Sequence, residues 1–402
     1  MIELHLDMFQ TVGLAAIVFW IGNFLIKKST LLSRYYIPAP LVGGLIFAAL
    51  NTILTATGTA TISLDDTLES ILMTVFFTTV GFSASIPLIK RGGKLITLIL
   101  FVSVVVLTVQ NLIGSSIASF FGIDPRLGVG VGSIALMGGP GTAAAFGATM
   151  ESPLYGVEGA TAVSLAAATF GLVAGSLLGG PTMRKRISHL EQKKEITMKE
   201  DVAVKDTDGS IEDETFETDT NRFIRAGMLL ALALGLGVIV SELLAATGIT
   251  FPGYMGALVM GAIIRNVVEA TGKIYPDNEI ITTGEVSLSL FLAMAMMGLE
   301  LWVLADLAIP IIAILIVQVI FMFLFSYFIL FNVLGKNYDA AVQTAGFIGY
   351  AMGSTSNAMA NMQTITRKYG PSPAAYIAIP IGGTFSDFFN AIIITGFLNF
   401  FT

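Results

Sequence analysis

Gly138-Gly139-Pro140-Gly141-Thr142 interrupts a very hydrophobic stretch of the chain, and Gly353-Ser354-Thr355-Ser356-Asn357 interrupts another roughly 215 residues later. Each interruption is flanked by apolar arms of about ten residues, or roughly 15 Å of helix, which reach only halfway into a bilayer. They predict two re-entrant hairpins, over residues 127–150 and 338–366. Because broken backbone at this depth is tolerated only where it is buried in protein or lines a water-filled cavity, the duplicated pair indicates a solute pathway and predicts a transporter.

The composition supports an integral membrane protein. The chain has 402 residues, of which 54% are hydrophobic and 12% are charged, and its mean hydropathy is +0.82. Long apolar runs favour membrane helices over the alternating strands of a barrel, so the expected fold class is an all-α polytopic membrane protein. Cysteine is absent, and the two histidines, His5 and His189, fall near the N-terminus and in a polar segment. We therefore expect neither a cofactor nor a metal centre built from thiolate or imidazole ligands.

Ten transmembrane helices are predicted, five in each half of the chain. They cover 7–26, 38–56, 67–88, 95–119 and 159–181, then 223–246, 252–269, 282–305, 309–334 and 373–399. A hairpin returns to the side from which it entered, so five crossings and a hairpin leave the second half upside down. The sequence thus predicts two inverted five-helix repeats, over 1–182 and 223–402, joined by a linker over 183–222.

The basic residues give the orientation of these helices. Nearly all of them fall on one side of the predicted topology, and Arg126 is the only one placed on the other. By the positive-inside rule the basic side is cytoplasmic, so both termini are expected outside and the linker inside, in a bacterial cytoplasmic (inner) membrane. The linker mixes Lys, Glu, Asp and Thr without apolar periodicity, which favours a flexible tether over a regulatory segment.

The two interruptions carry groups that could replace water around a polar solute. Helix N-termini beside the breaks offer free N–H groups and partial positive charge, which suit a carboxylate, whereas unwound carbonyls suit a cation such as sodium. The alternative is that the glycines only permit close helix packing, but the duplication favours binding. The predicted substrate-binding residues are Gly139, Gly141, Thr142, Ser354, Thr355, Ser356, Asn357 and Asn361.

Asp387 is the strongest single candidate for a functional side chain. It falls near the middle of the last predicted helix, where a carboxylate costs about 2.5 to 3.5 kcal/mol and usually faces a cavity. We expect it to help bind a cation or a substrate amino group, with Asn390 nearby; a purely structural carboxylate is the alternative. Gln110 and Asn111 are further candidate cation ligands, although deep amides such as these and Gln318 also join helices.

Two polar residues receive a structural interpretation instead. Arg265 and Asn266 end a predicted helix at the cytoplasmic surface. An arginine in that position normally extends its guanidinium to the interface, so we expect Arg265 to be solvated and to have no part in binding.

Several longer motifs resemble the bacterial sodium/glutamate symporters. They are Pro38–Gly44, Ala167–Val173, Val286–Met294, Gly335–Val342 and Ala360–Gln363. The resemblance spans nearly the whole chain and implies sodium-driven uptake of L-glutamate, a homodimer, and an elevator-like movement of a domain that carries both hairpins. Gly139, Gly141, Thr142, Gly353 and Thr355 match the family's hairpin tips. Pro140, Ser356 and Asn357 stand where that family has histidine, proline and threonine.

The leading hypothesis is therefore a sodium-coupled symporter for L-glutamate or a similar acidic amino acid. A sodium- or proton-coupled carrier of another organic anion, such as a dicarboxylate, is the alternative. A passive channel could also place broken helices at a pore, but duplicated inverted hairpins favour alternating access. An intramembrane enzyme is not expected, because a single deep aspartate without cysteine or membrane histidine gives no nucleophile–base pair.

Overall fold

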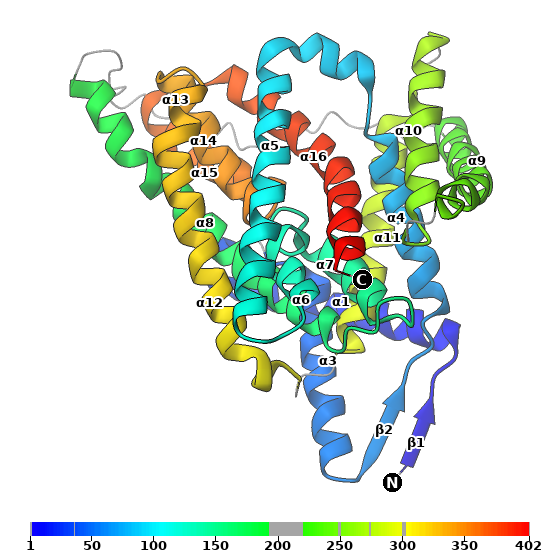
Figure 1. The fold of residues 1–402 in the computed structure, drawn as a ribbon. Coiled ribbons are helices and arrows are strands. Elements are labelled where there is room, and N and C mark those ends of the chain that lie inside the picture. Colours follow the sequence, from blue (N-terminus) through cyan, green and yellow to red (C-terminus); the bar gives the residue numbers. More distant parts are fainter. Residues whose placement is uncertain are drawn as a thin grey trace.

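The computed structural model describes residues 2–35, 37–192, 220–247, 251–272, 275–299 and 303–401. Helices dominate the described residues (Figure 1). Outside the two interrupted regions they are α1 (Met8–Lys28), α2 (Thr30–Arg34), α3 (Ala39–Ala56), α4 (Thr67–Phe82), α5 (Ile86–Phe120), α8 (Ala160–Gln192), α9 (Thr220–Ala245), α10 (Met255–Ala270), α11 (Asp277–Met297), α12 (Val303–Leu324) with η2 (Phe325–Leu330) and α13 (Phe331–Val333), and α16 (Pro373–Phe400).

A helix lies at each of the ten predicted positions, and the all-α membrane class is confirmed. Among the described residues, eight helices are long and apolar enough to cross a membrane. The other two, α4 and α10, have 16 residues each. At 1.5 Å per residue each extends about 24 Å, which is shorter than a hydrocarbon core of about 30 Å. The number of crossings therefore stays a prediction.

Local sequence explains where several helices begin, bend and end. Asp7 starts α1, because its carboxylate accepts hydrogen bonds from the backbone N–H groups of Phe9 and Gln10 in a capping box. Lys27 and Lys28 occupy the last turn of α1, where positive charge favours the helix dipole. Within α5, Gly93 has φ 61° and ψ −153°, which breaks the helical path seven residues after its start. Only glycine adopts that backbone region readily.

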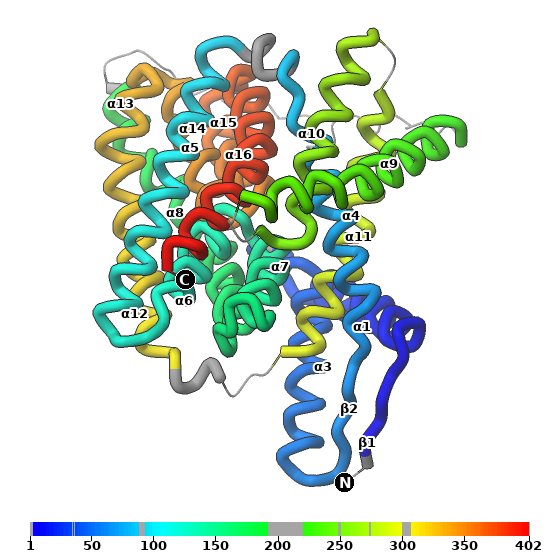
Figure 2. Tube along the Cα trace, turned by 45° about the vertical axis from the view of Figure 1, so that its right-hand side comes forward, coloured from blue at the N-terminus to red at the C-terminus, as the bar shows by residue number. Residues whose placement is uncertain are grey.

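The helices pack in two groups. The first, called here the outer group, comprises α1, α3, α4, α9, α10 and α11, and the second, the hairpin group, comprises α5 to α8 and α12 to α16. Figures 1 and 2 show the two groups side by side. The groups meet where α7 lies against α11, α16 against α4, and α5 against α10. Each group thus takes helices from both halves of the sequence.

Aromatic side chains fill part of the boundary between the groups. Phe146 of α7 lies edge-on to Phe77 of α4 and to Tyr254 at the start of α10, with ring centroids 6.4 Å and 5.7 Å apart. Phe77 and Tyr254 stack on each other at 4.2 Å. The three rings belong to the largest buried cluster, so the hydrophobic core continues from one group into the other.

Two features differ from the sequence-based expectations. The first ten residues of the predicted 183–222 linker continue α8 as far as Gln192, and Met183, Ile187 and Leu190 are buried there; residues 193–219 of that linker lie outside the described residues. Two short parallel strands, β1 (Ile2–His5) and β2 (Ala60–Ser63), were not predicted. They lie near the N-terminus beside the end of α3, as Figure 1 shows.

Candidate functional site

Each interrupted region consists of helical segments on either side of a break, and we call the two regions the first and second hairpin; their re-entry into the membrane stays a prediction. The first hairpin comprises α6 (Pro125–Val129), the π-helix η1 (Gly130–Ile134) and α7 (Gly139–Glu151). The second comprises α14 (Tyr338–Ala351) and α15 (Thr355–Tyr369). In both views the second hairpin lies in the upper part of the molecule and the first lies below it, near mid-height (Figures 1 and 2). They approach each other from opposite ends.

The tips of the two hairpins touch. Gly139 has φ +68°, and a Cβ atom placed on it would lie 3.0 Å from the carbonyl oxygen of Gly353. A side chain at this position would therefore be strained by the backbone and would crowd the opposite tip. Residues 214 positions apart in the chain (139 and 353) meet here because the small residues permit it. The structure thus brings together the two sequence motifs from which the function was predicted.

Side chains from neighbouring helices satisfy the broken backbone of the first hairpin. At Gly132 the backbone leaves the helical region, with ψ −127°. Asn111 Oδ1 accepts a hydrogen bond from the Ser133 N–H at 2.9 Å, and Asn390 both accepts from Ser133 Oγ (2.7 Å) and donates to its carbonyl oxygen (3.1 Å). All three residues are buried. This is the internal pairing that broken backbone needs at membrane depth.

The neighbouring residue of α5 reaches the second hairpin. Gln110 Nε2 donates to the carbonyl oxygen of Ala351 at 2.9 Å, where α14 ends. Gln318 of α12 in turn donates to the Gln110 carbonyl oxygen at 2.7 Å. Two adjacent residues of α5, Gln110 and Asn111, therefore hold the break in one hairpin and the end of α14 in the other.

The second hairpin is bound tightly to α8. Asn357 Nδ2 donates to the Leu172 carbonyl oxygen at 2.8 Å, and Asn361 Nδ2 donates to that of Gly175 at 2.9 Å. A Cβ atom on Gly179 would lie 2.2 Å from Asn361 Nδ2, so that glycine makes room for the amide. The structure gives both asparagines a helix-joining contact. The Asn357 Oδ1 atom remains buried without a donor among the described residues.

The predicted binding residues at the two tips differ in exposure. Gly141 and Thr142 are buried, and Gly141 lies against Leu288 of α11 and Phe76 of α4. Thr355 and Ser356 are exposed, whereas Ser354 caps α15 by accepting from the Asn357 N–H at 3.3 Å. Because α7 begins at Gly139 and α15 at Thr355, two helix N-termini lie at the meeting point. Such N-termini favour an anionic group.

Asp387 lies in the middle of α16 and is linked to the second hairpin by a residue that the sequence did not single out. The Tyr350 hydroxyl, on α14, is within hydrogen-bonding distance of Asp387 Oδ1 (2.9 Å) and of the Gly383 carbonyl oxygen (2.7 Å). A buried tyrosine three residues before a glycine-rich tip needs a polar partner. That requirement is the signal by which Tyr350 could have been found.

A cavity of about 380 Å³ lies between α16 and the outer group, beside the contact of α16 with α4. It extends from Phe76 and Leu288, beside the first tip, past Asp387 and Thr384 to Arg265. Its polar lining residues are Thr79, Ser83, Arg265, Tyr275, Asp277, Glu285, Thr384 and Asp387. The cavity therefore joins the neighbourhood of the tips to the far end of α10.

Arg265 is buried, contrary to the expectation of a solvated interface arginine. Its guanidinium forms ion pairs with Asp277 (2.7 Å) and Glu269 (2.8 Å) and stacks on Tyr275 at 3.7 Å. Only 6% of the residue is exposed. Two carboxylates compensate the cost of burying its charge, which a cytoplasmic surface position would not have required.

The described residues contain no group of three or more His, Asp or Glu side chains that could hold a metal ion. Oxygen ligands for a cation would come from amides, carbonyls and Asp387. Gln110 Oε1 and Asn357 Oδ1 are buried without a hydrogen-bond donor among the described residues. Such oxygens suit a hard cation better than they suit an apolar core.

A helical membrane protein whose two broken helices meet tip to tip belongs to the class of secondary transporters. The profile of the family described as sodium/glutamate symporter matches residues 4–371. The chain is 39% identical over 404 residues to the sodium/glutamate symporter of Escherichia coli (strain K12), covering 98% of each chain, and 35% identical over 390 residues to that of Haemophilus influenzae (strain ATCC 51907 / DSM 11121 / KW20 / Rd), covering 96% of each. The chain belongs to the sodium/glutamate symporter family, which is a family of transporters and not of enzymes.

Proposed function

We propose that this protein is a secondary active transporter that carries L-glutamate, or a similar acidic amino acid, together with sodium. The observation that supports the proposal most strongly is the contact between the tips at Gly139 and Gly353, which places the N-termini of α7 and α15 at one point. The names of its relatives agree with this chemistry, since each is a sodium/glutamate symporter.

The substrate carboxylates would bind at the two helix N-termini. The backbone N–H groups around Gly139, Gly141 and Thr355 supply donors there, and the hydroxyls of Thr142, Thr355 and Ser356 supply more. Ser354, Asn357 and Asn361 would shape the site by fixing the second tip, through the cap on α15 and the bonds to α8.

Sodium would bind where oxygen atoms lack donors. Gln110 Oε1 lies at the end of α14, and Asp387 carries the negative charge beside Tyr350. Asn111 and Asn390 would support this region by holding the break at Ser133. Solute and cation would then be coupled because both bind one arrangement of the tips.

We further propose that the chain forms ten crossings in two inverted repeats, 1–182 and 223–402, with an elevator-like movement of the hairpin group against the outer group. The presence of helices from both halves in each group supports this arrangement. Both termini would lie outside and the linker inside the cytoplasmic (inner) membrane of a bacterium. A homodimer is proposed as the working unit, to be checked by native mass spectrometry in detergent.

Uptake of labelled L-glutamate into proteoliposomes tests the function. We expect accumulation against the gradient when sodium is higher outside, and none when potassium replaces sodium on both sides. Competition by aspartate but not by a dicarboxylate that lacks an amino group would favour an amino-acid site. Equal competition by the dicarboxylate would favour the organic-anion alternative, and equilibration without accumulation would favour a channel.

A further inference from the structure

The connection between α4 and α5 joins the two helix groups. The chain passes from one group to the other after α4, after α8 and after α11. Of these three connections, only the first has its backbone described throughout. It begins after Phe82, where α4 ends, and reaches the hairpin group through Gly93 of α5. Any movement of one group against the other must be accommodated in each of the three connections, including this one.

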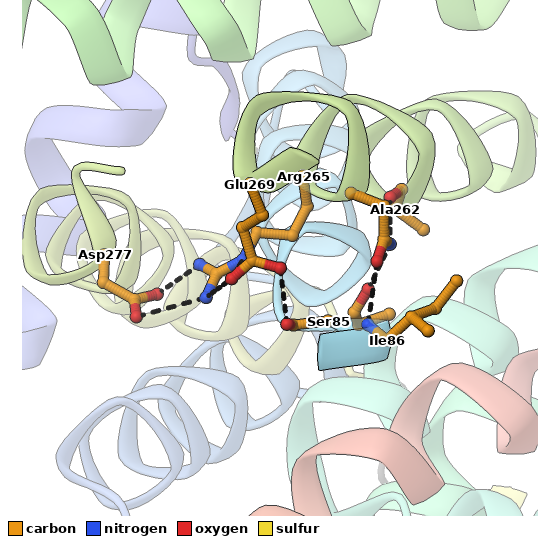
Figure 3. A network of polar contacts seen from close by, with 8 residues as sticks. Ser85, Ile86, Ala262, Arg265, Glu269 and Asp277 are labelled. Atoms are coloured by element: carbon orange, nitrogen blue, oxygen red, sulfur yellow. Dashed lines mark hydrogen bonds and ion pairs between the residues drawn. The ribbon is translucent and has the colours of Figure 1, made fainter. Parts of the chain in front are cut away.

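Helix α10 of the outer group holds the start of this connection at three points. Asn266 Oδ1 accepts from the Ile86 N–H at 2.8 Å, while Asn266 Nδ2 donates to the Ala84 carbonyl oxygen at 2.7 Å. Ser85 Oγ donates to Glu269 Oε2 at 2.6 Å. Figure 3 shows these contacts together around Ser85 and Ile86. We call Asn266 and Glu269 the α10 clamp.

Arg265 holds the Glu269 carboxylate of the clamp in place. Its Nε donates to Glu269 Oε1 at 2.9 Å, so that Oε2 of the same carboxylate is left to face Ser85. Its terminal nitrogens reach Asp277 at the start of α11, which ties the clamp to a second helix of the outer group (Figure 3). Charge-assisted bonds of this kind are short and geometrically specific. Ser85 is fully buried, so its bond to Glu269 competes little with water, whereas the Asp277 side chain is 56% exposed.

Beyond the clamp the connection has room to bend. Gly93 adopts φ 61° and ψ −153°, and a Cβ atom placed there would meet nothing within 4 Å. The chain is therefore held rigidly at residues 84–86 and turns in open space at Gly93. A joint with one fixed end and one free turn is the geometry that a hinge requires.

We propose that the α10 clamp is the fixed end of the joint on which the hairpin group moves. Asn266, Glu269, Arg265 and Ser85 are then positioning residues for the transport cycle, although none of them touches either tip. The proposal rests on the transport function proposed above. Its consequence is specific: loosening the clamp slows the movement, because the joint gains unproductive arrangements, and leaves the affinity of the tips for substrate unchanged.

Ser85→Ala and Glu269→Gln test the clamp, with Thr271→Ala as the matched control. Thr271 lies two residues from Glu269 and is exposed, and its hydroxyl donates to the Val268 carbonyl oxygen of its own helix at 2.7 Å. We expect Ser85→Ala to lower the sodium-driven uptake rate by about threefold to tenfold and Thr271→Ala to leave it unchanged. The dissociation constant for glutamate in sodium, measured on detergent-solubilised protein, should change by less than about twofold in every variant.

The uptake rate of the double variant tells whether Ser85 and Glu269 act through one interaction or whether each substitution causes a separate defect. If Ser85 acts through Glu269, the double variant should be no slower than Glu269→Gln alone. Equal loss of binding and uptake in Ser85→Ala would overturn the proposal, as would an unchanged uptake rate. Failure of the unmodified protein to accumulate glutamate would count against the proposed function, whereas normal uptake by all variants would count against the clamp alone.

A crosslink tests whether the clamp stays closed during transport. The chain has no cysteine, so residues 85 and 269 can be replaced by cysteine as a unique pair and joined with a bifunctional thiol reagent. The two cysteines remove the bond between Ser85 and Glu269 and should slow uptake, so the crosslink should keep or raise the uptake rate and should not stop it. The same reagent applied to cysteines at Phe146 and Tyr254, which meet across the group boundary, should stop uptake. Arrest by the crosslink between 85 and 269 would show that the clamp opens and would refute the proposal.

Discussion

The two hairpins meet at one point but are built differently. The first has a break inside its arm, at Gly132, which side chains from α5 and α16 satisfy, and its tip is buried. The second has two regular helices separated by three residues, and its tip leaves Thr355 and Ser356 exposed. The first tip is therefore buried and held in place by its neighbours, whereas the second tip presents exposed hydroxyls that a solute can reach.

The hydrogen bonds that hold the two hairpins in place also differ. Asn111 and Asn390 grip the backbone of the first hairpin itself, at Ser133. The second hairpin is held by two neighbouring helices. Asn357 and Asn361 of α15 donate to α8, and Tyr350 of α14 contacts Asp387 of α16. If the function is as proposed, changes in the first hairpin should damage the shape of the site, and changes in the second should alter its affinity.

Gly139→Ala should have the largest effect. The substitution forces a side chain into φ +68° and places its Cβ 3.0 Å from the Gly353 carbonyl oxygen. The backbone strain alone costs about 1 to 3 kcal/mol, so we expect uptake to fall by about tenfold to more than a hundredfold. Gly156→Ala is the control, because Gly156 has φ +61° with nothing near its Cβ. That variant should lose stability but keep its uptake per folded molecule; equal uptake by both variants would refute a special role for the tip contact.

Asp387→Asn should have the second largest effect on transport. It keeps an acceptor for the Tyr350 hydroxyl but removes the negative charge beside the second hairpin. If that charge helps to bind sodium, the sodium concentration for half-maximal uptake should rise by about tenfold or more, equivalent to about 1.4 kcal/mol. Thr384→Val, in the same cavity one turn earlier, should leave it unchanged. Normal sodium dependence in Asp387→Asn would remove this residue from the cation site.

The hydrogen bonds from α16 to the two hairpins should differ in their contribution to stability. Asn390→Ala leaves the Ser133 hydroxyl and carbonyl oxygen buried without their amide partner, and each such group costs about 1 to 3 kcal/mol. Tyr350→Phe removes one hydroxyl, which can donate to the Asp387 carboxylate or to the Gly383 carbonyl oxygen, and the loss of one bond to a charged group is about 1.5 to 3 kcal/mol. Thermal unfolding in detergent should therefore show a larger shift for Asn390→Ala. The reverse order would mean that the break does not depend on α16.

The sequence located the helical breaks well because short-range chemistry determines them. The predicted range 127–150 compares with Pro125–Glu151, and 338–366 with Tyr338–Tyr369. A run of glycine, serine and threonine has low helix propensity, and in each of these two regions such a run coincides with the turn between two helices. Asp387 could likewise be selected from its depth alone, although its role in binding remains a prediction.

The residues that support the breaks could not be found in the same way. Asn390 lies 257 positions from Ser133, and no local pattern links them. The interior break at Gly132 was missed because its sequence resembles any small-residue helix. Arg265 was assigned to the surface from its place at a helix end, yet Glu269 one turn later was a visible sign of an ion pair. Contacts made across the fold, rather than along the chain, decide these positions.

Ser356→Ala should affect substrate affinity and little else. The side chain is exposed at the second tip, so its removal should change the free energy of unfolding by no more than about 0.5 kcal/mol. Loss of one hydrogen bond to a charged carboxylate should weaken glutamate binding by about 1.5 to 3 kcal/mol if the contact is direct. Thr364→Ala, exposed two turns further along α15, is the control. Equal glutamate affinity in the two variants would place the substrate away from Ser356.

The smallest effect on stability is expected from the hydrogen bonds that join the two outer ends of each hairpin. Arg126 joins the ends of the first by donating to the Tyr155 carbonyl oxygen at 3.0 Å, and the Tyr338 hydroxyl does so in the second by donating to that of Gly370. Burial raises the pKa of the Asp124 carboxyl, but hydrogen bonds and charge from Arg126 outweigh burial and lower it below its ordinary value. Burial raises the pKa of Tyr338 to about 12. Both closures therefore persist from mildly acidic to mildly alkaline pH.

Acid should weaken only the first closure. A carboxyl whose pKa is lowered by folding contributes stability above its unfolded pKa of about 3.9, and that contribution is lost as pH falls through the lower folded value. Because Asp124 and Arg126 are partly exposed, the contribution is no more than about 1 kcal/mol. Arg126→Gln should thus lower the unfolding temperature slightly at pH 7 and converge with the unmodified protein once pH falls below the lowered folded pKa of Asp124. A difference that persisted in acid would mean that Arg126 acts through the Tyr155 carbonyl and not through Asp124.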